Sequence, residues 1–210
     1  MPISLTTPNN FSTLNMQDMV DTFGLQKINP IVFPKSTKII TIDPFISKQL
    51  TKFQNEIENW NETELSLKQL AFILASVDLD GEQYSSFAER PITAIVDGFR
   101  LTGLVDFVVA KGKYEPRNPY FFIQEFKKAK NPSGDPLPQL LGEMLVAQEL
   151  NQNKVIYGTY IVGRFWYFVA MNNRDFTELI PLDSTNLEDL ETILSHLNWV
   201  KSYVEEQVKK

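Results

Sequence analysis

Apolar residues recur every three or four positions in several parts of the chain, which is typical of helices that pack one face on a core. This spacing predicts helices over residues 44–59, 62–77, 136–151 and 186–209. Asp43-Pro44 is a good helix start, and Asn61 and Asp135 are candidate caps. The sequence therefore predicts four long helices with marked beginnings.

Shorter apolar runs, rich in aromatic and β-branched residues, alternate with these helices and predict strands. They cover residues 91–97, 100–110, 119–127, 155–162 and 165–171. Asp97-Gly98 and Gly163-Arg164 are the expected turns between neighbouring strands. We expect a polar loop over 111–119 and a turn over 131–136. The order of elements indicates an α/β domain with a mixed central sheet.

Charged side chains interrupt two of the predicted strands. Asp106 stands inside an apolar run, and Glu125 and Lys127 end another. Side chains alternate along a strand, so Glu125 and Lys127 leave on the same face. Two carboxylates and one ammonium on adjacent strands can hold a divalent cation and an attacking water, which is the equipment for cutting a phosphodiester.

These residues resemble the signature of the PD-(D/E)XK nuclease superfamily. One motif of that superfamily is an Asp, often after Gly, at the start of a strand, here Gly103-Leu104-Val105-Asp106. The next is Glu or Asp, any residue, then Lys at the end of the following strand, here Glu125-Phe126-Lys127. Val105 stands where the superfamily sometimes has Pro. The resemblance covers roughly residues 60–170, and the pattern is similar to stand-alone relatives of the nuclease domain of restriction enzymes.

The resemblance implies a restriction-endonuclease-like fold, with a mixed central sheet flanked by helices. Residues 61–210 would form the nuclease-like domain, and residues 1–60 would form an N-terminal arm and helix that make one compact unit with it. The first 40 residues are turn-rich, with an amphipathic stretch near 15–23. We expect this arm to wrap the domain or dock on a partner.

The resemblance also implies a set of site residues. Asp106, Glu125 and the carbonyl of Phe126 would hold Mg²⁺ or Mn²⁺, because such hard ions prefer oxygen ligands. Lys127 would orient the attacking water or stabilise charge on the phosphate. A Gln in the following helix is common in the superfamily, and Gln139 stands in such a place.

The superfamily usually adds a Glu from the first helix of the domain. Glu62 is the first choice, because it opens the helix predicted over residues 62–77. Glu64 is the second choice, and Glu89, just before the first predicted strand, is the third. Each of them also fits the plainer role of an acid favoured near a helix start.

Charge changes what is expected of the partner. The 210-residue chain has a net charge of −6, which argues against broad electrostatic binding of nucleic acid. A basic segment stands against that total, formed by Lys111, Lys113, Arg117, Lys127, Lys128 and Lys130. We therefore expect weak unaided binding, or a protein partner or homodimer that assists it.

Composition excludes several other chemistries. With no cysteine and one histidine, a zinc site, a Cys-His pair and a His-dependent triad are disfavoured. We expect His196 on the surface of the last helix, and Trp60, Trp166 and Trp199 in the core. No glycine-rich phosphate loop is present. No apolar stretch suggests a membrane partner and the first ten residues do not resemble a signal peptide, so we expect a cytoplasmic location.

Two hypotheses follow from the sequence. The first is a metal-dependent nuclease that hydrolyses phosphodiester bonds of nucleic acid, with DNA as the expected form. The second is a catalytically idle module of the same fold that binds DNA or protein. Intact Asp106, Glu125 and Lys127 favour the first, and the acidic net charge favours the second.

Overall fold

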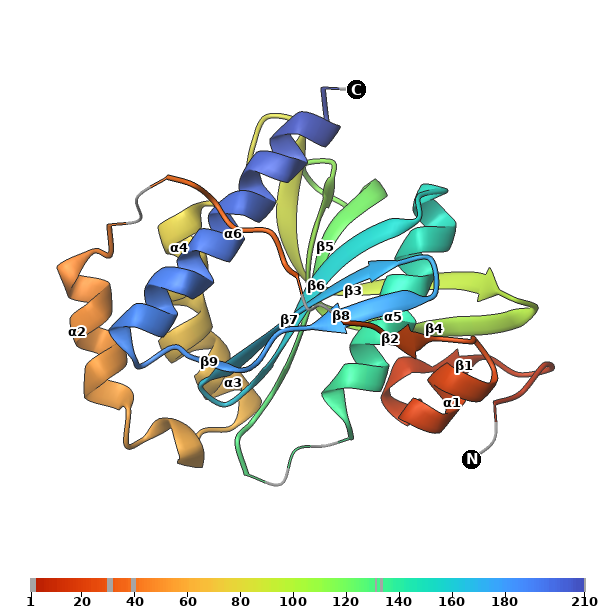
Figure 1. The fold of residues 1–210 in the computed structure, drawn as a ribbon, viewed down its shortest axis with the longest axis horizontal. Helices are drawn as coiled ribbons and strands as arrows, with labels where there is room; N and C mark the ends of the chain where they lie inside the picture. Colours follow the sequence, from red (N-terminus) through yellow and green to blue (C-terminus); the bar gives the residue numbers. More distant parts are fainter. Residues whose placement is uncertain (1–2, 30–31, 39–40, 131, 133, 210) are drawn as a thin grey trace.

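The computed structural model describes residues 3–29, 32–38, 41–130, 132 and 134–209. In this part of the chain, helices cover both faces of a large mixed sheet (Figure 1). The helices are α1 (Met16–Asp21), α2 (Pro44–Phe53), α3 (Glu62–Leu65), α4 (Ala71–Val77), α5 (Pro136–Asn151) and α6 (Leu187–Gln207). Short 3-10 helices cover Phe11–Thr13 and Ile57–Asn59, and a π-helix covers Ser66–Leu70.

Nine strands of the described residues form the sheet. They are β1 (Asn9–Asn10), β2 (Gln26–Lys27), β3 (Tyr84–Val96), β4 (Phe99–Lys111), β5 (Arg117–Lys127), β6 (Val155–Val162), β7 (Phe165–Asn172), β8 (Asp175–Glu178) and β9 (Leu182–Asp183). The order across the sheet is β1-β4-β5-β6-β7-β8-β2, with β3 paired to β4 and β9 to β7. β5 and β6 run parallel, and α5 connects them.

The predicted strands are confirmed, and four of them, β3, β4, β5 and β7, are longer than expected. β3 begins at Tyr84 rather than at residue 91, so Pro91 lies inside it. Proline lacks an N–H, and β3 tolerates it because this strand pairs on one side only, with β4. Asp97 and Gly98 have φ of 51° and 88°, the left-handed conformation that a tight hairpin turn requires.

The helix predicted over residues 44–59 is the clearest error among the helices. α2 ends at Phe53, and the chain turns before the 3-10 helix Ile57–Asn59. This turn brings the Phe53 and Trp60 rings together edge to face, with centroids 5.1 Å apart. The helix predicted over 62–77 runs unbroken as α3, the π-helix and α4.

The end of β5 leads into α5 through the turn predicted over residues 131–136. Asn131 and Ser133 of that turn lie outside the described residues. Asp135 caps α5 as expected, since its carboxylate accepts a 3.2 Å hydrogen bond from the Leu137 N–H. Pro136 follows at the first helical position.

The N-terminal arm wraps the sheet. β1 pairs with β4 in parallel, and β2 pairs in parallel with β8 at the other edge. Phe11, Met19 and Phe23 are buried in the core between the sheet and α5. The arm therefore supplies part of the core.

Two apolar layers separate the helices from the sheet. α5 packs on one face through Leu140, Leu141, Met144 and Leu145, as its apolar spacing predicts. α4 and α6 cover the other face, as Figure 1 shows. α5 is buried on nearly all sides, because the arm covers its outer surface.

The sequence predicted three tryptophans in the core and His196 on the surface, and the structure tests these predictions. Trp60 and Trp166 are buried, and Trp199 packs at the edge of the layer beneath α6. The expectation of a surface histidine is wrong, because His196 is only 4 % exposed. Its Nδ1 forms a 2.8 Å hydrogen bond with the carbonyl of Pro34 in the arm. No helix in the described ranges has both the length and the apolar character needed to cross a membrane.

Candidate functional site at the end of β4 and β5

Asp106 and Glu125 meet where β4 and β5 separate. The antiparallel ladder of these strands ends at Phe107 and Gln124, and the next positions in the same register are Asp106 and Glu125. There the side chain of Asp106 replaces a backbone acceptor: its Oδ2 accepts a 2.9 Å hydrogen bond from the Phe126 N–H. The two carboxylates therefore stand on neighbouring strands, as predicted from the sequence.

Asp106 lies on a stretch of β4 that has no ladder partner on the β5 side, because β4 changes its partner there. β1 pairs with Leu101 and Thr102, so Gly103–Asp106 lies between the end of β1 and the end of the β5 ladder. Gly103 is required here for packing. A Cβ at this position would come within 2.5 Å of the Phe11 ring, which is fully buried.

Asp106, Glu125 and Lys127 share the face of the sheet that α5 covers. Ile123 packs in the core on the α5 side, and Glu125 and Lys127 follow it at alternate positions. Glu125 is fully buried, Lys127 is 7 % exposed, and the two form an ion pair. Phe126 packs in the opposite layer.

The backbone of Phe126 turns toward Asp106. The Lys127 carbonyl accepts a 2.9 Å hydrogen bond from the Gly163 N–H, on the β6 side of the strand. Backbone groups of successive residues point to opposite sides of a strand, so those of Phe126 face β4. The N–H of Phe126 is bonded to Asp106, and its carbonyl oxygen points to the same side.

The pKa values in the site reflect two carboxylates that lie close together and are largely buried from solvent. Burial, and next the negative charge of Asp106, raise the pKa of Glu125 to about 8, although Lys127 acts against this shift. Burial also raises the pKa of Asp106, against the Phe126 N–H and Lys127. For Lys127, burial alone would lower the pKa, but Glu125, Asp106 and Glu62 together raise it.

α5 adds a third buried carboxylate, which we did not predict. Glu143 is fully buried, and its Oε1 accepts a 3.4 Å hydrogen bond from Nε2 of Gln139, one turn earlier. Burial, Glu125 and Asp106 raise its pKa well above the ordinary value. Gln139 is also buried, on the side of α5 that faces this cluster. The signal in the sequence was the place of Glu143 among Leu140, Leu141, Met144 and Leu145, the residues expected to pack on the sheet.

The three candidates for the first-helix Glu are separated by the structure. Glu62 opens α3 and is close enough for its charge to act on both Asp106 and Lys127. Glu64 is engaged locally, since it accepts a hydrogen bond from the Asn61 N–H and pairs with Lys68 at 2.9 Å. Glu89 is exposed on β3, although the β3–β4 register places it across from Asp106.

The donor set suits a hard cation. In the part of the chain that the structure describes, Lys127 is the only cation paired with Glu125, and the Asp106 carboxyl also lies within hydrogen-bonding range of it. Oε2 of Glu143 and Oε1 of Gln139 have no donor there. Among the same residues, no three Asp, Glu, His or Cys side chains form a ready metal-binding group. Two carboxylates and the Phe126 carbonyl make a smaller ligand set, and the surplus of buried acceptors fits a positive ion beside them.

The basic segment of the sequence does not form one surface. Lys111 pairs with Arg117 where β4 leads into β5, whereas Lys127 ends β5 ten residues later. At about 3.3 Å per residue, these groups lie on the order of 30 Å apart. Lys130 stays near the carboxylates' end of the sheet, where it donates a 2.9 Å hydrogen bond to Asn59.

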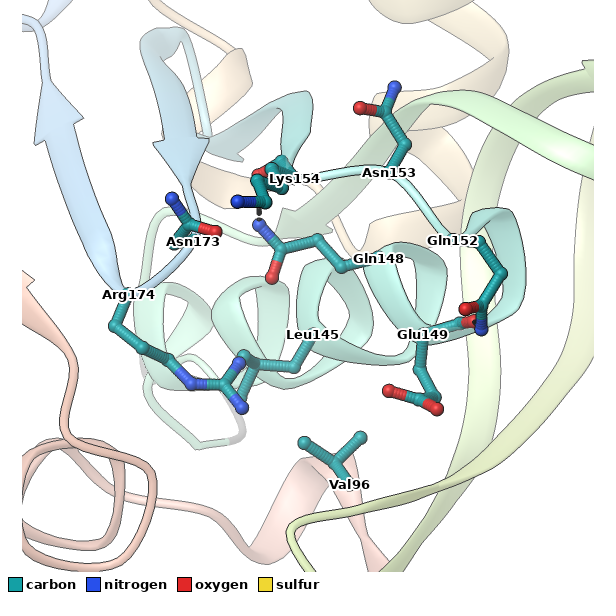
Figure 2. A pocket seen from close by; sticks show the side chains of 9 residues that line it. All are labelled: Val96, Leu145, Gln148, Glu149, Gln152, Asn153, Lys154, Asn173 and Arg174. Atoms are coloured by element: carbon teal, nitrogen blue, oxygen red, sulfur yellow. Dashed lines mark hydrogen bonds between the residues drawn. The ribbon is translucent and has the colours of Figure 1, made fainter.

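A separate cavity of about 340 Å³ lies at the C-terminal end of α5 (Figure 2). Val96 and Leu145 form its apolar part, with Glu149 and Arg174 around them. Gln148 is tied by a 2.5 Å hydrogen bond to the Lys154 carbonyl. The lining of this cavity contains both positive and negative side chains and lacks the cluster of carboxylates found at β4 and β5. The candidate chemistry therefore belongs to the other end of α5.

Comparison with protein-family models and with curated proteins found no match to this chain. The residues and their geometry therefore carry the functional interpretation.

Proposed function

We propose that this chain is a divalent-cation-dependent nuclease of the PD-(D/E)XK type that hydrolyses phosphodiester bonds, with DNA as its expected substrate. The observation that carries the proposal is the meeting of Asp106 and Glu125 in register, with Lys127 on the same face and the Phe126 carbonyl turned toward them. Chance placement of an acid in a strand does not explain all three features.

The element order supports a restriction-endonuclease-like core. A helical segment (α3 to α4) precedes the meander β3-β4-β5, and α5 then leads to β6 beside β5. This is the succession of helix, three strands, helix and strand that the sequence resemblance implies. The candidate residues lie where β4 and β5 separate, and Asp106 is partly exposed there.

Each residue has a role in this proposal. Asp106, Glu125 and the Phe126 carbonyl would hold Mg²⁺ or Mn²⁺, and the ion would supply an acidified water and neutralise charge on the phosphate. Lys127, held by Glu125, stabilises negative charge as it grows on the phosphate. Glu62, partly exposed at the start of α3, is the candidate whose charge acts on both Asp106 and Lys127, and it would act on incoming water.

Cleavage tests this proposal directly. The purified chain is incubated with single- and double-stranded DNA and RNA in Mn²⁺ or Mg²⁺, and its Mn²⁺ affinity is measured by calorimetry. Asp106→Asn should weaken binding and cleavage together, since it removes a charged ligand. Lys127→Ala should lower cleavage by ~10²–10³ while Mn²⁺ binding remains, since it removes a transition-state donor.

Lys111→Ala is the matched control, because Lys111 is an exposed lysine that ends β4, opposite the start of β5 and far from Lys127. It should cleave like the wild type. A wild-type chain that binds no divalent cation and cuts none of these substrates would overturn the proposal in favour of the idle module. Cleavage by Lys127→Ala at the wild-type rate would remove the role given to Lys127 alone.

A further inference from the structure

Glu143 is poorly compensated for a buried carboxylate. It lies in the middle of α5 and is fully buried. Its one hydrogen bond, from Gln139, is long at 3.4 Å, and its Oε2 has no donor among the described residues. Gln139 is 7 % exposed, and its own Oε1 also lacks a donor in that part of the chain. A buried charge with so little support is costly, so this carboxyl either holds a proton or has a positive group nearby.

The buried charges do not balance within the chain. Asp106, Glu125 and Glu143 carry three negative charges when ionised, and Lys127 carries one positive charge. Two negative charges are left, and a single divalent cation would neutralise them. Without Glu143, only one would be left. Glu62 is partly exposed, so water screens its charge.

We propose that the negative charge of Glu143 adapts the affinity of this site to a divalent cation. Glu143 acts across the cluster through its charge and is not itself a ligand. This inference rests on the proposed function, in which Asp106, Glu125 and the Phe126 carbonyl are the ligands. It agrees with the lack of a ready group of three carboxylates among the described residues. Charges act strongly over several ångströms in a dry interior, so a residue outside the ligand set can set the affinity.

The coupling between α5 and the strands supports this role. Glu125 and Asp106 are, after burial, the causes of the raised pKa of Glu143, and Lys127 acts on it in the opposite direction. Glu143 thus experiences the charge of every group that would surround the ion. A cation placed there would in turn experience the charge of Glu143.

The test compares ions of different charge. Binding of Mn²⁺ and of a trivalent lanthanide is measured by calorimetry for the wild type and for Glu143→Gln, which keeps the shape and removes the charge. Mn²⁺ affinity should fall roughly 10–100-fold, the usual effect of altering a group behind the ligands. The lanthanide should lose more, because the Coulomb energy grows with the charge of the ion.

Two further variants separate charge from structure. Glu143→Asp keeps the charge and should keep most of the affinity, and Glu149→Gln, an exposed acid on the same helix, should bind as the wild type. Equal losses for both ions, no loss in folded Glu143→Gln, or no retention in Glu143→Asp would each overturn this inference while the proposed nuclease could stand. A wild type that binds neither ion would overturn both.

Discussion

Opposing influences act on Glu125. Burial and the nearby Asp106 favour its protonated form, whereas the ion pair with Lys127 favours the carboxylate. Glu143 experiences the same conflict, with burial as the main cause of its raised pKa. Without a cation, protons are the positive charges available to these residues. The stability of the fold is therefore linked to pH through two buried acids.

We expect the stability of the cation-free protein to fall as the pH rises from about 5 to about 8. The folded pKa of Glu125 is near 8, above its usual 4.5, so the folded chain keeps a proton that the unfolded chain has released. Stability must then decrease with pH across this window, by up to about 1.4 kcal/mol per pH unit for each such group. Urea denaturation in the presence of a chelator measures the slope.

Glu125→Gln and Glu143→Gln should each flatten that slope, because a neutral amide releases no proton. Glu149→Gln should leave it unchanged, since Glu149 is exposed. Stability that stays level or rises over the same range would show that these acids are ionised in the folded protein.

At the scale of elements, the site depends on how β4 exchanges one partner for another. The pairing of β5 with β4 ends at Phe107 of β4, and β1 pairs with β4 at Leu101 and Thr102. Phe11, just after β1, packs its ring on the bare backbone of Gly103. The glycine that resembled part of a nuclease motif therefore has a packing reason as well. It lets the N-terminal arm close over β4 beside Asp106.

Gly103→Ala should destabilise the protein by about 1–3 kcal/mol, the usual cost of an added methyl in a packed core. The new Cβ would lie 2.5 Å from the Phe11 ring, which is fully buried and has little room to move. Combining it with Phe11→Leu in a double-mutant cycle should show a loss smaller than the sum of the two. Leu104→Ala, at an exposed position of β4, is the control. Unchanged denaturation midpoints for Gly103→Ala would contradict the contact.

The sequence predicted an element accurately where clear boundary residues mark the ends of that element. α5 and β6 have the predicted bounds, because Asp135-Pro136 and Gly163 are strong boundary signals. The alternation of β5 correctly placed Glu125 and Lys127 on one face. β1, β2, β8 and β9 were missed, since strands of two to four residues depend on a distant partner and have little local pattern. Glu143 was missed because its place beside Asp106 and Glu125 depends on how α5 packs on the sheet, which the sequence of the helix alone does not show.

At the scale of the whole molecule, the arm joins the two layers of the fold. Its first part places Phe11 and Met19 in the core beneath α5. A later part places Phe33 in the other core, against His196 and Phe168. One chain segment thus holds both faces of the sheet. If the contact between the arm and α6 weakens, the arm should detach from that face of the sheet.

We expect the contact between the arm and α6 to weaken in acid. Burial lowers the pKa of His196, so the folded protein holds this ring neutral. For a base with a lowered pKa, the stability it contributes is complete above its usual pKa of 6.5 and is lost as the pH falls through the lowered value.

Hydrogen exchange at Ser36, whose N–H donates a 3.0 Å hydrogen bond to the Ser195 carbonyl, reports on the contact between the arm and α6. Relative to the exchange rate of an unfolded peptide, protection of Ser36 should drop at low pH in the wild type. His196→Phe, which cannot take a proton, should show a weaker dependence on pH, and equal dependence in both proteins would exclude His196 as the group responsible.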